Sequence, residues 1–288
     1  MKVKILGVSG SPRVGNTETA VQIALNAAKE VSSSIETEFI SLASLKINPC
    51  EGCYSCYGFK KGADWEHICF IHKDDVAMVY KKMVEADGII FGSPSYAFDI
   101  SAKLKALFER GAPFCHYAGS RLSGALSHKV VGGVVVAFER RGGQESALAT
   151  IHRFAMAIGS SFVVGARPFP SDPPPQASFL GGLVDTCDSK MSLGKEGILP
   201  ETSRTRPPVS GIFNVRSLRN IGKTVAEGAL VVKAGLLSLE KEGFMLSPLP
   251  IVNFPAEIIK ENSYFDRVRK GLEKPPKYQI FPDFLEKK

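Results

Sequence analysis

Apolar runs alternate with amphipathic stretches along the first 170 residues of the chain. The segment 2–10 (KVKILGVSG) is almost continuously apolar and predicts a buried parallel strand. The next segment, 17–31, carries Val21, Leu25 and Ala28 on one face of a helix. The alternation continues with strands predicted at 36–42, 87–93, 129–138 and 161–169 and helices at 74–86, 101–111 and 143–159. This pattern is typical of a doubly wound parallel sheet, which binds ligands at the carboxyl ends of its strands.

The second half of the chain departs from this alternation. Residues 170–211 are rich in proline, serine and glycine, which predicts a long irregular excursion. A final helix is expected at 215–243, where it would cover the remaining face of the sheet. We therefore expect one domain over 1–243, followed by a proline- and aromatic-rich extension, 244–288, that packs on the domain or on a neighbouring subunit.

Composition and charge narrow the class of protein. The 288 residues are 44% hydrophobic and 23% charged, which suits one well-buried core. The net charge of +7 favours phosphorylated cofactors or acidic partners. No nucleic-acid-binding signature accompanies this charge, and no run of about 18 apolar residues or secretory leader occurs. We expect a cytoplasmic protein with neither a nucleic acid nor a membrane as partner.

Crowded cysteines are the most specific chemical feature of the chain. Cys50, Cys53 and Cys56 form the motif CEGCYSC, and Cys69 follows after a gap of twelve residues. Cytoplasmic thiols are kept reduced, so this crowding favours metal or redox chemistry over disulfides. A 4Fe-4S cluster needs four thiolates, and a Cys-x-x-Cys-x-x-Cys turn can supply three while a more distant cysteine supplies the fourth. Cys69 is the first candidate for the fourth ligand, and Cys115 is the reserve.

Two other interpretations of the cysteines stay open. Zinc also takes four thiolates, or three with a histidine, and His67 and His72 lie nearby. Zinc sites more often use two separated Cys-x-x-Cys pairs, however, and a single run of three favours iron and sulfur. The remaining possibility is a set of reduced cysteines that bind no metal.

A loop of small hydroxyl-bearing residues, SGSPRVGNTETA, follows the first predicted strand. It offers hydroxyls, backbone N–H groups and a helix N-terminus to an anion, and Arg13 adds a formal charge. The loop lacks both the Walker A ending and the Gly-x-Gly-x-x-Gly pattern, so a nucleoside triphosphate or a Rossmann NAD site is poorly supported. The alternative is a capped turn that binds nothing.

Two further loops of small residues leave the same predicted edge. The third strand ends in GSPSYAFDIS, where Tyr96 presents an aromatic face, and the fourth ends in the glycine-rich FERRGGQES. Three such loops that converge on one rim would hold a flat, phosphate-bearing ligand.

The segments GSPRVGNT, GSPSYAFDISAKLKALFER and RRGGQESAL, in this order, resemble the flavodoxin-like NAD(P)H-dependent FMN reductases. The resemblance covers about residues 1–170 and the helix near 215–235. It implies a flavodoxin-like α/β fold, a doubly wound parallel five-stranded sheet of order 2-1-3-4-5, with FMN at its rim. The residues to which it assigns FMN binding are Ser9, Ser11, Arg13, Asn16, Thr17, Pro94, Ser95, Tyr96, Glu139, Arg140, Gly142, Gly143 and Gln144.

The cysteine-rich loop 48–72 is similar to that of the iron-sulfur flavoproteins, whose motif lies between the second strand and the following helix. This resemblance implies that FMN exchanges electrons with a 4Fe-4S cluster held by the four cysteines, and that an external carrier completes the transfer. Strand two neighbours strand one in the implied sheet, so we expect the thiols near an FMN of the same chain or of a neighbouring subunit. The cofactors carry the chemistry, so no catalytic side chain is expected.

The expected partners are an electron donor or acceptor, such as NAD(P)H, ferredoxin or a quinone-like carrier, and further copies of the chain in a homo-dimer or homo-tetramer. Two alternative functions accompany this expectation. One is an NAD(P)H-dependent FMN or quinone reductase without a metal. The other is a non-catalytic binding or sensor protein that carries zinc.

Overall fold

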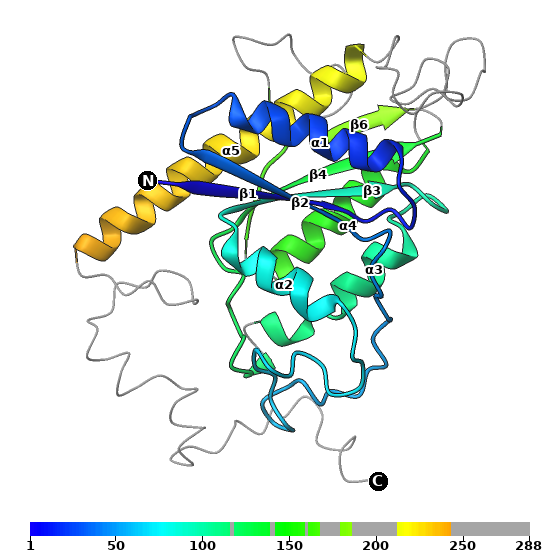
Figure 1. Ribbon diagram of the computed structural model, residues 1–288, viewed down its shortest axis with the longest axis vertical. Helices are drawn as coiled ribbons and strands as arrows, with labels where there is room; N and C mark the ends of the chain where they lie inside the picture. The colour runs from blue at the N-terminus through cyan, green and yellow to red at the C-terminus, as the bar shows by residue number, and fades with distance from the viewer. Residues whose placement is uncertain (116–117, 139–141, 159–160, 168–178, 186–211, 243–288) are drawn as a thin grey trace, which may run out of the picture.

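A computed structural model of the protein describes residues 1–115, 118–138, 142–158, 161–167, 179–185 and 212–242. These residues build three layers, with a parallel sheet between two layers of helices (Figure 1). The strands are β1 (Val3–Ser9), β2 (Ile35–Ser41), β3 (Gly88–Pro94), β4 (Val130–Ala137), β5 (Phe162–Val163) and β6 (Gly182–Asp185). Their order is β2-β1-β3-β4-β5, with every pairing parallel, which confirms the predicted flavodoxin-like order.

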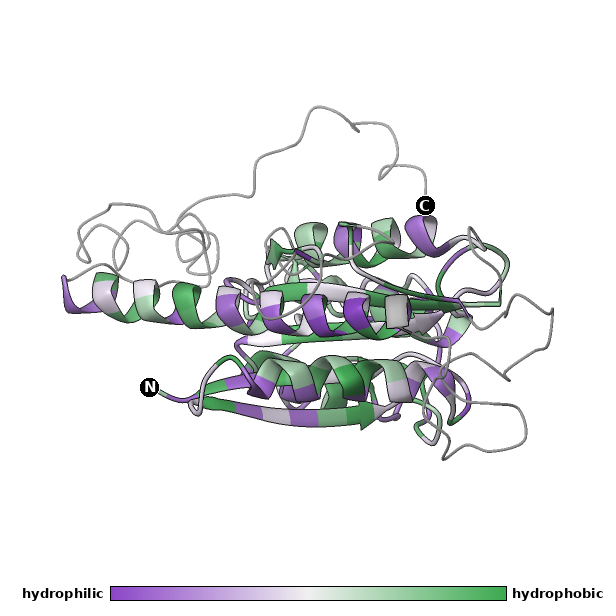
Figure 2. Cartoon of the chain, turned by 90° about the horizontal axis from the view of Figure 1, so that it is seen from above, coloured by the Kyte–Doolittle hydropathy of each residue, from purple (hydrophilic) through white to green (hydrophobic). Residues whose placement is uncertain are grey.

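Helices cover both faces of the sheet. The α-helices are α1 (Asn16–Lys29), α2 (Val76–Glu85), α3 (Ala102–Glu109), α4 (Gln144–Ala157) and α5 (Ile212–Lys241), with a 3-10 turn η1 (Ala112–Phe114) after α3. α1 and α5 pack on one face, and α2, α3 and α4 pack on the other. Coloured by hydropathy, these helices carry both green and purple residues, as amphipathic helices do (Figure 2).

The apolar runs of the central strands explain the two-sided burial. Successive side chains of a strand point to opposite faces, so Ile5 joins the core beneath α1 and α5, while Leu6 joins the core beneath α2, α3 and α4. Both are fully buried, and burial of one such side chain contributes about 1.5–3 kcal/mol relative to exposure. A strand that serves two cores must be apolar on both faces, which is why β1, β3 and β4 read as continuous apolar runs.

Two short strands, rather than one, fill the fifth position of the sheet. β5 pairs with Val130 and Val131 of β4, and β6 pairs with the later residues 134–137 of the same strand. The sequence predicts one strand at 161–169 and an irregular excursion over 170–211. The prediction of irregular structure is wrong for residues 182–185, which form β6. The rest of that excursion and the extension 244–288 lie outside the described residues.

The long C-terminal helix follows the prediction closely, since α5 spans 30 residues from Ile212 to Lys241. Its middle part packs against the sheet and α1, and Arg219 donates two hydrogen bonds, of 2.8 and 2.7 Å, to the carboxylate of Glu30, the residue after α1. No helix in the described ranges is both long enough and apolar enough to cross a membrane.

Candidate functional site: a loop-lined rim and a cysteine pocket

Residues 10–15 connect β1 to α1 at the carboxyl edge of the sheet. The hydroxyl of Ser11 donates to the carbonyl oxygen of Arg13 (2.6 Å) and accepts from the N–H of Arg13 (3.2 Å), which folds the loop into a compact turn. α1 begins at Asn16, and no side chain caps it. The first N–H groups of the helix and its positive dipole end therefore remain available to an anion.

Ser9, at the end of β1, has a buried hydroxyl with no hydrogen-bond partner among the described residues. Alternate residues of a strand share a face, and a Cβ added at Gly7 would meet Val21 and Leu25, so Ser9 lies on the face that α1 covers. A buried hydroxyl without a partner is costly. A ligand oxygen bound between Ser9 and the start of α1 would satisfy it.

Neighbouring elements hold the loop after β1 in place. The hydroxyl of Ser101 donates to the carbonyl oxygen of Gly10 and accepts from the N–H of Leu104 (3.1 Å), and thereby caps α3. The N–H of Gly10 in turn donates to the carbonyl oxygen of Gly92 on β3 (2.7 Å). Sequence reasoning missed Ser101 as a site residue, although serine directly before an amphipathic helix is a capping signal.

The loop after β3 forms a tight turn that presents two aromatic side chains. The backbones of Tyr96 and Asp99 exchange two hydrogen bonds, of 2.9 and 3.1 Å, across Ala97 and Phe98. Both intervening residues have positive φ angles, 48° and 64°, which are strained for side chains of their type. Tyr96 and Phe98 are both exposed, so an aromatic surface faces the solvent at the rim.

The loop after β4 lies directly against this turn. Ser95 donates a hydrogen bond to the carbonyl oxygen of Gly142. Gly143 precedes α4 with a φ of 87°, and a Cβ there would lie 2.3 Å from the Cα of Phe98, so only glycine fits. Gln144 is buried at the start of α4. Glu139 and Arg140 lie outside the described residues. The other predicted rim residues lie on three loops that contact one another, or at the strand and helix ends beside them.

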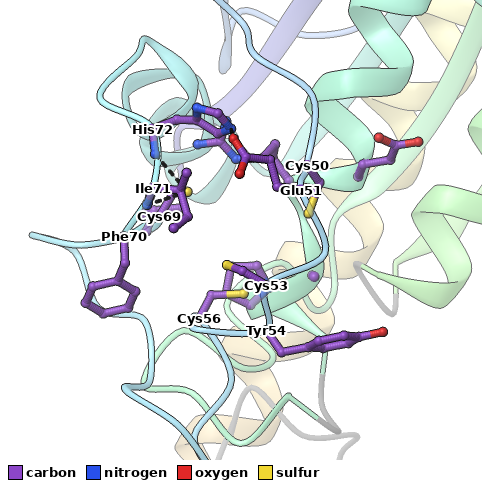
Figure 3. A pocket seen from close by; sticks show the side chains of 14 residues that line it. Cys50, Glu51, Cys53, Tyr54, Cys56, Cys69, Phe70, Ile71 and His72 are labelled. Atoms are coloured by element: carbon purple, nitrogen blue, oxygen red, sulfur yellow. Dashed lines mark hydrogen bonds and ion pairs between the residues drawn. The ribbon is translucent and has the colours of Figure 1, made fainter.

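The cysteine loop between β2 and α2 builds a second site. Cys50, Cys53, Cys56 and Cys69 line one open hollow, and Figure 3 shows their sulfurs around a common space. The end of α3 and the residues that follow it, including Arg110 and Pro113, also line the hollow.

The reserve candidate, Cys115, is not part of this hollow. Cys115 is fully buried and is absent from its lining, and Cys187 lies outside the described residues. All five cysteines in the described part of the chain are free thiols.

Backbone N–H groups and neighbouring charges shape the chemistry of the thiols. The N–H groups of Ile71 and His72 both donate to the sulfur of Cys69, each at 3.4 Å. Hydrogen bonds from Ser55 lower the pKa of Cys53. Burial, with the other three cysteines nearby, raises the pKa of Cys56 to about 11. Hydrogen bonds to sulfur stabilise thiolates and tune iron-sulfur clusters.

The two histidines of the cysteine loop lie beside carboxylates. Within the described ranges, no three His, Cys, Asp or Glu side chains are grouped as ligands of one ion. His72 Nε2 pairs instead with Glu51 at 3.1 Å, and His67 pairs with Asp64 at 3.6 Å. A zinc ion needs four donors about 2.0–2.3 Å from one point. Four irons, each with its own thiolate, need sulfurs that stand farther apart.

The rim and the hollow lie at opposite ends of α3. Ser101, before its first residue, contacts the loop after β1, whereas Arg110, after its last, lines the cysteine hollow. Eight residues of α-helix are about 12 Å long. The cysteine loop leaves the carboxyl edge, as the sequence predicts, but runs along α3 on the side of the sheet that α2 and α3 cover (Figure 1). Strand order alone therefore overstates the proximity of the thiols to the rim within one chain.

The strand order β2-β1-β3-β4-β5 defines the flavodoxin-like class of parallel sheets. The loop after β1, whose N–H groups are available to an anion, and the two loops beside it lie where this class binds its ligand. Residues 3–170 match the family of NADPH-dependent FMN reductases. An iron-sulfur flavoprotein of Methanocaldococcus jannaschii is 40% identical over 232 residues, which cover 80% of this chain and 100% of that protein.

Two further comparisons agree. An iron-sulfur flavoprotein of Methanosarcina thermophila is 38% identical over 164 residues, which cover 57% of this chain and 78% of that protein. Among solved structures, a flavone reductase superposes with a TM-score of 0.54 at 18% identity, covering 80% of this chain and 64% of that one, and this likeness supports the fold.

The chain belongs to the NADPH-dependent FMN reductase family and groups within it with the iron-sulfur flavoproteins. It is therefore an FMN-dependent oxidoreductase that works between an electron donor and an electron acceptor. The resemblance stated from the sequence motifs is confirmed.

Proposed function

We propose that the chain binds FMN at the three-loop rim and a 4Fe-4S cluster in the cysteine hollow, and that it passes electrons between FMN and an external carrier. The single observation that carries this proposal is that four cysteines, three from one motif and one from beyond it, line the same hollow. The name iron-sulfur flavoprotein, carried by the relatives above, supports the same function.

The residues around the rim fit FMN. Ser9 at the end of β1, Ser11 in the following loop and Thr17 in the first turn of α1 are buried. Their hydroxyls and the helix N-terminus would hold the phosphate. Arg13 is exposed and adds positive charge. Tyr96 lies where its ring would face the isoalloxazine.

The remaining rim residues are assigned by the family resemblance. They are Asn16, Pro94, Ser95, Glu139, Arg140, Gly142, Gly143 and Gln144. When bound, FMN accepts a hydride or single electrons, and these residues bind and orient it.

The residues of the hollow fit an iron-sulfur cluster better than they fit zinc. Their sulfurs surround a common space, and N–H groups of Gly52, Ile71 and His72 donate to two of them. Such donors favour a negatively charged cluster. Cys50, Cys53, Cys56 and Cys69 would be the four ligands, and the cluster would supply single-electron transfer.

The finer partners are also part of this proposal. NAD(P)H, ferredoxin or a quinone-like carrier would donate or accept the electrons. The separation of the two sites along α3 favours a homo-dimer or homo-tetramer, in which the thiols of one subunit approach the FMN of another. The extension 244–288 would contribute to that contact, and domain 1–243 would hold both cofactors. A cytoplasmic location suits the free thiols.

Anaerobic purification, followed by quantification of flavin, iron, sulfide and zinc, tests the function. We expect FMN together with equal amounts of iron and sulfide, and a broad absorption beneath the flavin bands that bleaches on reduction. FMN without iron would identify a metal-free FMN or quinone reductase. Zinc without flavin would identify a binding or sensor protein, and either result would reject the proposal.

A further inference from the structure

An ion pair is buried beside the cysteine hollow. Arg110 and Asp74 have side chains only 4% and 1% exposed, and the guanidinium donates two hydrogen bonds to the carboxylate, of 2.9 and 3.2 Å. The other ion pairs found among the described residues have at least one half-buried or exposed partner. Removal of two charges from water costs considerable desolvation free energy, so we ask what this buried pair does in the protein.

The pair ties both ends of the cysteine loop to the end of α3. Arg110 also donates to the carbonyl oxygen of Asn48 at 3.1 Å. Asp74 accepts from the backbone N–H of Asn48 at 3.0 Å and from its amide group at 3.1 Å. Asn48 lies two residues before Cys50, and Asp74 lies five residues after Cys69. One ion pair therefore holds the entry and the exit of the cysteine loop together.

The pair is oriented with respect to the thiols. Arg110 belongs to the lining of the hollow and Asp74 does not, so the positive member of the pair is the one that borders the thiols. The other ionisable groups of the lining, apart from the four thiols and Tyr54, are Glu51, Glu109 and His72. The carboxylates of Glu51 and Glu109 are 57% and 40% exposed, so water and salt screen them. Water and salt hardly reach the buried charge of Arg110, which is offset by its partner Asp74. His72 pairs with Glu51 at 3.1 Å.

We propose that Arg110, held by Asp74, is a positioning residue that fixes the cysteine loop and raises the reduction potential of the cluster bound there. This inference rests on the proposed function. Reduction adds one electron to the cluster, supplied by reduced FMN or by the external carrier, and no bond forms or breaks. The reduced cluster would be the more negative state, so a buried ion pair whose positive member borders it would favour reduction.

Two variants test this inference, because they change the field at the hollow in opposite directions. In Asp74→Asn the charge of Arg110 loses its counter-charge, and the midpoint potential of the cluster should rise. In the double variant Arg110→Gln/Asp74→Asn both charges are gone while amide hydrogen bonds can replace the ionic ones, and the potential should fall below that of the wild type. A residue that acted only on loop structure would not move the potential in opposite directions.

The experiment is a potentiometric titration of the full chain, followed by the electron paramagnetic resonance signal of the reduced cluster, with iron content and circular dichroism as checks. The double variant Arg219→Gln/Glu30→Gln is the matched control. It removes another ion pair with two hydrogen bonds, neither residue of which lines the hollow, and it should keep the wild-type potential. If one test variant does not fold, the sign of the shift in the other decides. Unchanged potentials, or shifts in the same direction, in iron-loaded variants would overturn the inference, whereas a wild-type chain without iron would overturn the proposed function instead.

Discussion

The hydroxyl of Ser101 lies 2.5 Å from the carbonyl oxygen of Gly10, a residue 91 positions away in the chain, and donates a hydrogen bond to it. The same hydroxyl caps α3 by accepting from the N–H of Leu104. α3 therefore supports the loop after β1 with its first turn and the cysteine hollow with its end, where Arg110 lies. A short helix thus connects the two candidate cofactor sites.

The substitution Ser101→Ala should weaken both the fold and FMN binding. It removes a helix cap and the hydrogen bond to Gly10, and we expect the free energy of unfolding to fall by about 1–2 kcal/mol. The loop after β1 would lose its anchor, so the dissociation constant for FMN should rise as well. Urea unfolding and FMN fluorescence titration measure the two effects. Ser32→Ala, which removes a turn hydroxyl bonded to Ser34, is the control for FMN binding, and equal FMN affinity in the Ser101 variant would contradict the prediction.

The substitution Ser9→Ala should move stability and FMN binding in opposite directions. The buried hydroxyl has no partner among the described residues, so its removal should stabilise the FMN-free protein by about 1 kcal/mol. The lost hydrogen bond to the phosphate should weaken FMN binding roughly fivefold. Thermal unfolding without FMN and titration with FMN give the two values. A destabilised apoprotein with unaltered affinity would mean that Ser9 faces a protein partner rather than the ligand.

Joint replacement of Arg13 and Thr17 should reduce FMN retention while the fold stays intact. Arg13 is exposed and Thr17→Val keeps the buried shape, so the unfolding transition should change by less than about 1 kcal/mol. Loss of a charge and of a hydroxyl at the helix N-terminus should raise the dissociation constant about tenfold or more. If the folded double variant bound FMN with wild-type affinity, the assignment of the FMN phosphate to this loop would be wrong.

Lys129 should make the protein more stable as the pH rises above 8. Burial lowers its pKa from 10.5 to about 8, against an opposing effect of Asp87, and its amine donates to the carbonyl oxygen of Val84. Between about pH 8 and 10.5 the unfolded chain holds a proton that the folded chain has lost, so the free energy of unfolding should rise with pH, by about 1–3 kcal/mol in total.

The variant Lys129→Met should lose this rise, whereas Lys29→Met, at an exposed position on α1, should keep it. Chemical unfolding at a series of pH values gives the slopes. Parallel slopes for the wild type and Lys129→Met would contradict the assignment.

The sheet could be predicted largely because its central strands serve two cores. β1, β3 and β4 must be apolar on both faces, and this leaves a strong pattern in the sequence. β6 has only four residues, and contacts with β4 and α5 hold it in place. It pairs with β4, and the N–H of Leu183 donates to the hydroxyl of Ser217 on α5. Tertiary contacts of this kind leave little local signal, so the split fifth strand could not be predicted.

The candidate site also combines residues that the sequence predicts with residues that only tertiary contacts bring together. Spacing and residue type identified the four cysteines, because a short motif requires them to be close. The ion pair of Asp74 and Arg110 joins residues 36 positions apart, so no local pattern in the sequence indicates it. Strand order placed the start of the cysteine loop correctly, but the path of that loop along α3 depends on contacts such as the one from Lys103 to the carbonyl oxygen of Ala43.

Iron bound per chain in Cys69→Ala and Cys115→Ala, after anaerobic preparation, shows whether the four cysteines of the hollow hold one cluster. Cys69 lines the hollow with Cys50, Cys53 and Cys56, while Cys115 is buried outside its lining. We predict that Cys69→Ala loses its iron as severely as Cys53→Ala, whereas Cys115→Ala retains the wild-type four irons of a 4Fe-4S cluster and all three retain FMN. A full cluster in Cys69→Ala, or its loss in folded Cys115→Ala, would contradict the account.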